Sequence, residues 1–190
     1  MILPVELRPT KSVAVRLPSG TSATLPVAYP SFQSWTGKKV FDFGRKPLLD
    51  YDGEVCFAEL LILRLLFKSG WSGVWVEAYG GGRHVYYLQS MPASWTLAPH
   101  HIPIPYDKHA LLRQIARVAD TPSCFDVFVW SGEQILFCEA KYVNPPNKDR
   151  LRETQLKFIE GALACGIPPQ ALLLVEWSKL VPATPGGSFR

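Results

Sequence analysis

Apolar and polar residues alternate with two distinct periods along the middle of the chain, and these periods predict most of the secondary structure. Apolar residues recur with helical spacing over residues 52–68, 107–119 and 148–165. Patterns typical of strands cover residues 73–79, 84–89, 125–130, 134–142 and 171–176. Asp52 is positioned to cap the first helix, while Gly70 and Gly166 are positioned to end the first and the third. This order of elements predicts an α/β fold with a central mixed β-sheet flanked by α-helices.

The two ends of the chain have weaker patterns than the middle. Residues 1–50 contain six of the 17 prolines and only short extended stretches, such as residues 12–17 and 39–43. We therefore expect them to form an irregular N-terminal arm packed on the domain of residues 51–180. Residues 181–190 carry two prolines and two glycines with few apolar residues, which predicts a flexible tail.

Composition narrows the class of protein. An apolar fraction of 47% and a net charge of +4 are typical of a folded domain and exclude extended disorder. The longest apolar run, residues 60–67, is interrupted by Arg64 and is much shorter than the roughly 20 residues of a membrane span. Glu6 and Arg8 stand where the apolar segment of a signal peptide would lie. We expect no membrane association and a cytoplasmic protein, whose four cysteines lack metal-binding spacing and are reduced thiols.

Three charged residues of the predicted hairpin carry the chemistry. Glu139 and Lys141 are two apart in a strand and so project to the same face. If the chain turns at residues 132–133, Asp126 lies opposite Glu139. Two carboxylates and an ammonium group at one end of a sheet could hold a hard divalent cation such as Mg²⁺ and activate a water molecule. The alternative is an Asp at a strand entrance and a solvated Glu–Lys pair on an edge strand.

The third helix adds two features beside this group. Gln155 lies within the apolar stripe, four residues after Leu151, and could reach a bound water or a phosphate. The alternative is that the backbone satisfies its amide. Basic residues outnumber acidic ones along this segment, which suits contacts with a phosphate backbone, although a solvated helix face would read the same way. The basic residues are Lys141, Lys148, Arg150, Arg152 and Lys157.

Asp126 followed by Glu139-Ala140-Lys141 resembles the signature of the PD-(D/E)XK nucleases. The continuation over residues 149–155, Asp-Arg-Leu-Arg-Glu-Thr-Gln, resembles the virus-type replication-repair nuclease (VRR-NUC) subfamily. Two departures stand out. Phe125 replaces the proline that usually precedes the first aspartate, and the loop over residues 142–148 is longer than usual.

The resemblance implies a restriction-endonuclease-like fold and metal-dependent hydrolysis of DNA phosphodiester bonds, selective for DNA structure rather than sequence. It implies that Asp126, Glu139 and the Ala140 carbonyl hold Mg²⁺ or Mn²⁺. Lys141 would then position the attacking water or stabilise the transition state, with Gln155 assisting through hydrogen bonds. The predicted nuclease domain is residues 51–180, and similarity to small relatives implies a homodimer.

Relatives of this kind also carry a metal-binding acid on the first helix. Glu59 lies on the apolar side of residues 52–68 and is our prediction; Glu54, in the expected first turn, is the alternative. Glu77 is either a further acid of the site or an ordinary edge-strand residue. The residues expected to contact DNA are Lys148, Arg150, Arg152 and, in the glycine-rich turn, Arg83. Two other functions remain open: a non-catalytic nucleic-acid-binding module on this scaffold, and a nuclease directed at RNA.

Overall fold

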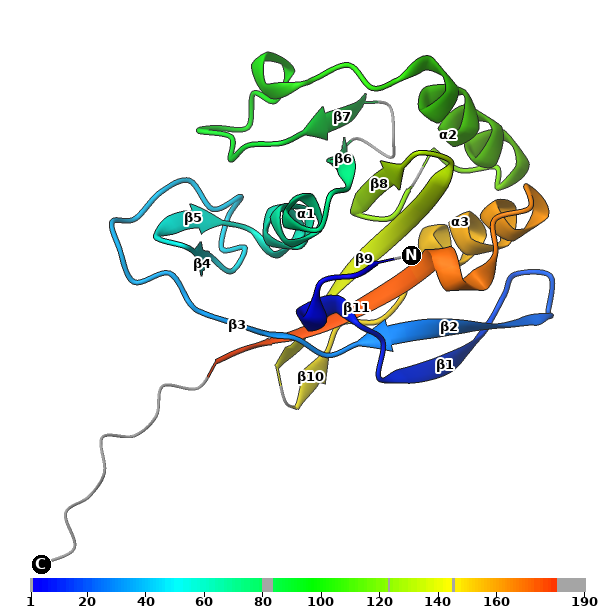
Figure 1. Cartoon of the computed structure of the whole chain (residues 1–190), viewed down its shortest axis with the longest axis horizontal. Helices are drawn as coiled ribbons and strands as arrows, with labels where there is room; N and C mark the ends of the chain where they lie inside the picture. Colours follow the sequence, from blue (N-terminus) through cyan, green and yellow to red (C-terminus); the bar gives the residue numbers. More distant parts are fainter. Residues whose placement is uncertain (1, 80–83, 123, 145, 181–190) are drawn as a thin grey trace, which may run out of the picture.

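A mixed β-sheet with helices on both faces forms the centre of the computed structural model, which describes residues 2–79, 84–122, 124–144 and 146–180 (Figure 1). The strands are β1 (Lys11–Arg16), β2 (Ser22–Ala28), β3 (Ser31–Phe32), β4 (Leu49–Tyr51), β5 (Glu54–Cys56), β6 (Ser72–Tyr79), β7 (His84–Leu88), β8 (Val127–Ser131), β9 (Gln134–Asn144), β10 (Asn147–Lys148) and β11 (Leu172–Lys179). The helices are α1 (Ala58–Lys68), α2 (Tyr106–Val118) and α3 (Glu153–Ala164), with short 3-10 turns at Val5–Leu7, Ala98–His100 and Pro169–Ala171.

The sheet has the strand order β1-β2-β11-β9-β8-β6-β7, and β3 and β10 add short pairings at its side. β11 runs parallel to both β2 and β9, whereas the other neighbours in this order are antiparallel. Because parallel neighbours cannot be joined by a tight turn, the chain leaves β9, forms α3 and returns as β11. The prediction of an α/β fold with a mixed sheet is confirmed.

The helices divide between the two faces of the sheet, and this division sets the direction of the charged side chains. α1 packs against Cys138 and Ala140 of β9, while α2 and α3 cover the face that carries Phe137. Side chains alternate along a strand, so Glu139 and Lys141 project with Phe137 toward the α3 side. Within the ranges given above, no helix is long and apolar enough to cross a membrane.

The first helix begins later than predicted. Asp52 does not cap it: this residue has a φ of 54° in the turn between β4 and β5, a left-handed conformation that Asp tolerates. Residues 54–56 are therefore the strand β5, and α1 starts at Ala58. Its end is as predicted, because Gly70 follows the helix with a φ of 83°.

The third helix also begins later than predicted. Residues 147–148 form β10, which pairs with the end of β9, and the Asp149 N–H donates to the Tyr142 carbonyl at 3.2 Å. The backbone is thus already committed to strand contacts where the apolar spacing suggested a helix. α3 starts at Glu153 after the N-cap Arg152, and Gly166 follows its end with a φ of 84°.

The N-terminal 50 residues are more regular than predicted. β1 and β2 form a hairpin within the main sheet rather than an arm lying on it, although residues 39–43 form no strand. The apolar positions of β2, with Leu25 and Val27 fully buried, explain why this segment joins the core. The predicted tail, residues 181–190, lies outside the described residues.

Candidate functional site

The pairing of β8 with β9 ends at Val127, and Asp126 lies at the resulting opening of the sheet. β8 pairs with β9 from Ser131 back to Val127, which lies opposite Cys138, so the predicted hairpin register is confirmed. Asp126 precedes β8 by one residue. Its carbonyl accepts the Val76 N–H at 2.7 Å, which ties it to β6. Its carboxylate Oδ2 accepts the Ala140 N–H at 2.9 Å and so takes the place of a strand partner.

The main chain of Ala140 also contributes to this opening. In a β-strand, the N–H and C=O of one residue point to the same side, as the paired bonds of an antiparallel ladder require. Because the Ala140 N–H points to Asp126, the Ala140 carbonyl oxygen faces the same opening. The backbone therefore offers an oxygen where the resemblance implied one.

Glu139, Lys141 and Gln155 form one hydrogen-bonded group under α3. The side chains of Glu139 and Lys141 are 2% and 4% exposed, and Lys141 Nζ lies 3.0 Å from Glu139 Oε1. Lys141 Nζ also donates to Gln155 Oε1 at 2.9 Å, and Gln155 Nε2 donates to Glu139 Oε1. The Oε1 atom of Gln155 also accepts the Arg152 N–H at 2.8 Å as a helix cap, so the backbone satisfies part of its amide, as the alternative proposed. Contact of Gln155 with a water or a phosphate stays a prediction.

Burial dominates the electrostatics of the two acids. Removal from water raises the pKa of Asp126 to about 6, and the charge of Glu59 adds to this rise while Lys46 opposes it. Burial, with the charge of Asp126, raises the pKa of Glu139 well above its usual range despite the neighbouring Lys141 ammonium. Two acids with raised pKa values at one place are typical of a site that binds a cation or works on a substrate.

Glu59 is the third acid of this group, and it pairs with a lysine, Lys46, that was not predicted. It lies in the first turn of α1 with 7% of its surface exposed, and Lys46 Nζ lies 2.7 Å from its Oε1. Lys46 Nζ is also 3.7 Å from Glu77 Oε2. Burial lowers the pKa of Lys46, but the charges of Glu59 and Glu77 outweigh this and raise it overall. Burial raises the pKa of Glu77 to about 7.

The other predicted residues are more dispersed. Glu54 lies in β5 rather than in α1, with a side chain that is 69% exposed and paired with Arg64 at 2.8 Å, so the first-helix acid of this group is Glu59. Arg150 and Arg152 are exposed between β10 and α3. Lys148 is placed in β10 by its backbone alone. Arg83 lies outside the described residues.

A cavity of about 170 Å³ lies beside Glu59 and Ala140. Its wall includes Lys46, Glu59, Ala140 and Asp149. Asp149 also lies 3.6 Å from Lys141 Nζ, so it connects the cavity to the buried pair under α3. Asp126, Glu139, Lys141 and Gln155 are not among the residues of its wall.

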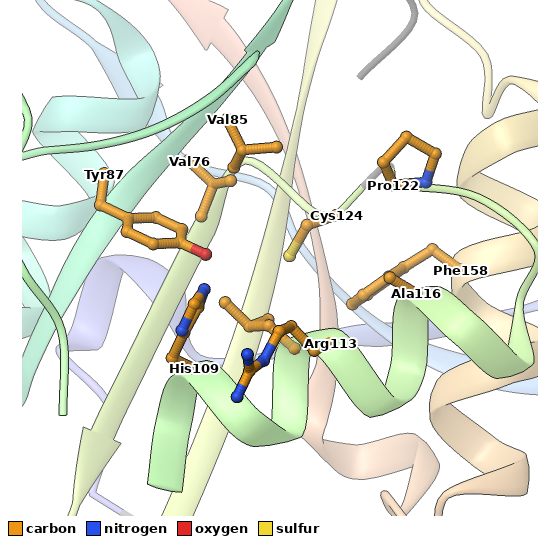
Figure 2. A pocket seen from close by; sticks show the side chains of 10 residues that line it. Val76, Val85, Tyr87, His109, Arg113, Ala116, Pro122, Cys124 and Phe158 are labelled. Carbon is orange, nitrogen blue, oxygen red and sulfur yellow. The ribbon is translucent and has the colours of Figure 1, made fainter. Parts of the chain in front are cut away.

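A second cavity, of about 210 Å³, lies between α2 and the strands β6 and β7 (Figure 2). Its wall is mainly apolar, and Figure 2 shows Tyr87, His109 and Cys124 directed toward it. Burial raises the pKa of the Cys124 thiol well above its usual range, which keeps it protonated and weakly nucleophilic. None of the predicted site residues lines this cavity, so we do not identify it with the site.

The donor atoms suit a hard divalent cation. The Oε2 atoms of Glu59 and Glu139 are buried and have no hydrogen-bond partner among the described residues. Carboxylate and carbonyl oxygens are the ligands of Mg²⁺ and Mn²⁺ in proteins. Within the described ranges, however, no three His, Cys, Asp or Glu side chains stand together in an arrangement that could hold an ion. Ammonium groups already engage one oxygen each of Glu59 and Glu139.

The fold brings close together five residues that the sequence predicted for the site, namely Asp126, Glu139, Lys141, Gln155 and Glu59. Lys46, which comes from a segment without periodic pattern, was not predicted. Comparisons of the chain with models of protein families, with curated proteins and with solved structures find no match.

Proposed function

We propose that the chain is a Mg²⁺- or Mn²⁺-dependent nuclease that hydrolyses DNA phosphodiester bonds on a restriction-endonuclease-like fold. One observation carries the proposal: buried carboxylate oxygens on Glu59 and Glu139, which have no hydrogen-bond partner in the described part of the chain, stand near Asp126 and Lys141. An unpartnered buried acid oxygen costs free energy in the folded protein, and binding a cation removes that cost. Acids beside a buried lysine are the residue set that the resemblance to the PD-(D/E)XK nucleases implies for phosphodiester hydrolysis.

The chain would supply the ion's ligands from Asp126, Glu139, the Ala140 carbonyl and Glu59. A divalent ion supplies Lewis-acid activation of the phosphodiester and of a water molecule. Because the pKa values of Asp126 and Glu139 are raised, these carboxyl groups release their protons as the ion binds. The site would therefore reach its working charge only when an ion is bound.

Lys141 would act on the reacting phosphate. Its Nζ has three protons, of which one goes to Gln155 Oε1 and another toward Glu139 Oε1, while Asp149 Oδ2 lies 3.6 Å away. A substrate oxygen would take the place of this longer contact with Asp149. A fixed ammonium in a site with little water stabilises the negative charge that develops on phosphorus-bound oxygens. Gln155 acts as a positioning residue, because it holds both Lys141 and Glu139.

DNA is the proposed partner. Arg150 and Arg152 are exposed next to the opening and would contact the phosphate backbone, which favours recognition of DNA structure over sequence. A homodimer, as the resemblance implies, is part of the proposal and can be measured by analytical ultracentrifugation. The four unpaired thiols fit a reducing compartment such as the cytoplasm.

The test is cleavage of end-labelled linear, flapped and four-way-junction DNA in Mg²⁺, Mn²⁺ or EDTA, with wild type and Lys141→Met. Methionine keeps most of the buried volume of lysine and removes only the charged group. We expect products with either ion, none in EDTA, and a loss of at least about 100-fold in the variant. Tight DNA binding without cleavage would favour a binding module, and cleavage of RNA alone would assign the nuclease to RNA.

A further inference from the structure

Lys46 lies among acids and aromatic rings in the wall of the cavity beside Glu59. Its Nζ lies 2.7 Å from Glu59 Oε1 and 3.7 Å from Glu77 Oε2. The same atom is 5.2 Å from the centre of the Phe57 ring and 5.3 Å from that of Trp75. Rings of this kind attract a cation through their negative faces. The ammonium group is thus held from several sides.

The backbone before Lys46 is built to hold it there. Phe43, Gly44 and Arg45 have φ values of 48°, 72° and 90°, a run that L-residues rarely adopt. Asp42 stabilises the turn, since its Oδ1 accepts the N–H groups of Gly44 and Arg45 at 3.1 Å each. The Lys46 N–H closes it by donating to the Asp42 carbonyl at 2.7 Å. Such conformations persist where surrounding contacts fix them, often at functional sites.

Lys46 occupies a place beside Glu59 and Glu77 that a second cation could take. Sites with two divalent ions place them about 3.5–4 Å apart and share carboxylates between them. Lys46 neutralises Oε1 of Glu59 and approaches Glu77, while Oε2 of Glu59 stays buried without a partner among the described residues. One Glu59 oxygen is therefore committed to the ammonium and the other is available to an ion. Lys46 also lies in the wall of the same cavity as Ala140.

We propose that Lys46 is a built-in cation that takes the place of a second metal ion and limits this site to one divalent ion per chain. The proposal rests on the proposed metal-dependent function and states how many ions it uses. An ammonium balances the charge of Glu59 and Glu77 as an ion would, but it is not a Lewis acid. The single ion would accordingly be held on the side of Asp126, Glu139 and the Ala140 carbonyl.

The experiment counts bound Mn²⁺ in the full chain without DNA. The electron paramagnetic resonance signal of free Mn²⁺ and isothermal titration calorimetry give the number of ions per chain for wild type, Lys46→Met and Lys46→Arg. We expect one ion in wild type, two in Lys46→Met, and one in Lys46→Arg, which keeps the charge. Two ions in wild type, or one in Lys46→Met, would overturn the role of Lys46 and leave the nuclease proposal standing. No bound ion in any of the three would overturn both.

Thermal unfolding in EDTA checks that each variant folds. Lys46→Met leaves Glu59 and Glu77 without their ammonium, so a second variant, Lys46→Met with Glu77→Gln, removes one of the two buried charges. This double variant retains Glu59 and Asp126 for the extra ion. It is expected to bind two ions as well, and a count of one would again overturn the proposal.

Discussion

The carboxylate of Asp126 accepts the main-chain N–H of Ala140 at 2.9 Å, one residue before β8 begins. A side chain thus completes the ladder where the neighbouring strand is missing, and it keeps the edge of β9 open to the cavity instead of closed by backbone. The same bond fixes one oxygen of Asp126. The charge of Glu59 raises the pKa of Asp126, and the charge of Asp126 raises the pKa of Glu139. Removing the charge without removing the bond separates the two roles.

Asp126→Asn is expected to fold and to lose cleavage. Its side-chain oxygen can still accept the Ala140 N–H, but it cannot supply a negative charge to an ion. We expect cleavage to fall by at least about 100-fold, as for loss of one group that stabilises a transition state. Asp126→Ala serves as the comparison, because it removes the hydrogen bond as well and should also lower the melting temperature. Full activity of Asp126→Asn would exclude Asp126 as a ligand.

Gln155→Ala should affect stability and activity together. The change removes the cap on the Arg152 N–H and the bridge between Lys141 and Glu139. We expect the free energy of unfolding to fall by about 1–2 kcal/mol and cleavage to fall by roughly 10-fold, as for residues that orient a metal ligand. Urea unfolding and initial cleavage rates measure the two effects.

The matched control for Gln155 is Glu153→Ala in the same turn of α3. Glu153 is 80% exposed and meets only Lys157, at 3.6 Å, among the ion pairs of the described residues. Its loss should change stability by less than about 0.5 kcal/mol. If Gln155→Ala and Glu153→Ala lost equally little stability and cleavage activity, the positioning role of Gln155 would be wrong.

The stability of the metal-free protein should depend on Glu77 as pH changes. Burial raises the pKa of Glu77 from 4.5 to about 7, so the folded state holds this proton more tightly than the unfolded state. The resulting stabilisation is complete below pH 4.5 and is lost as pH rises to about 7. Relative to Glu77→Gln, wild type should therefore lose stability on the order of 2 kcal/mol between pH 5 and 8.

Urea unfolding in EDTA at the two pH values measures this difference. Glu133→Gln, in the exposed turn between β8 and β9, controls for the loss of one negative charge. A difference between wild type and Glu77→Gln that stays the same at both pH values would contradict the prediction.

Arg150→Ala should weaken DNA binding in a salt-dependent way. Each arginine that neutralises a phosphate adds about one to the slope of log affinity against log salt concentration. We expect this slope to fall by about one in Arg150→Ala, measured by fluorescence anisotropy in EDTA so that no cleavage occurs. Arg117→Ala, exposed at the end of α2, should leave the slope unchanged. Equal slopes for wild type and Arg150→Ala would remove Arg150 from the DNA interface.

The hairpin that carries the site could be predicted because its determinants are local. Gly132 forms the turn, and the apolar residues on each side leave one register, in which Val127 faces Cys138. That register already brings Asp126 beside Glu139. Glu59 was also predictable, since an acid amid buried apolar residues of α1 calls for a partner.

The starts of α1 and α3 could not be predicted, because competing contacts decide them. Cys56 pairs with Leu49, and Asp149 donates to Tyr142, so strands replace the helical turns that the local pattern favoured. Lys46 could not be predicted from the sequence for the same reason. Its partners are Glu59 and Glu77, in separate elements, and nothing in its own surroundings in the sequence shows which segments it meets.

The position of β11 between β2 and β9 has a consequence for synthesis of the chain on the ribosome. β2 is made some 145 residues before the strand it pairs with, residues 172–179. Until then the N-terminal hairpin and β9 each expose an unpaired edge, which other chains can join. A chain truncated before residue 172 would therefore keep all the charged residues of the site but leave β2 and β9 with unpaired edges, and we expect it to aggregate.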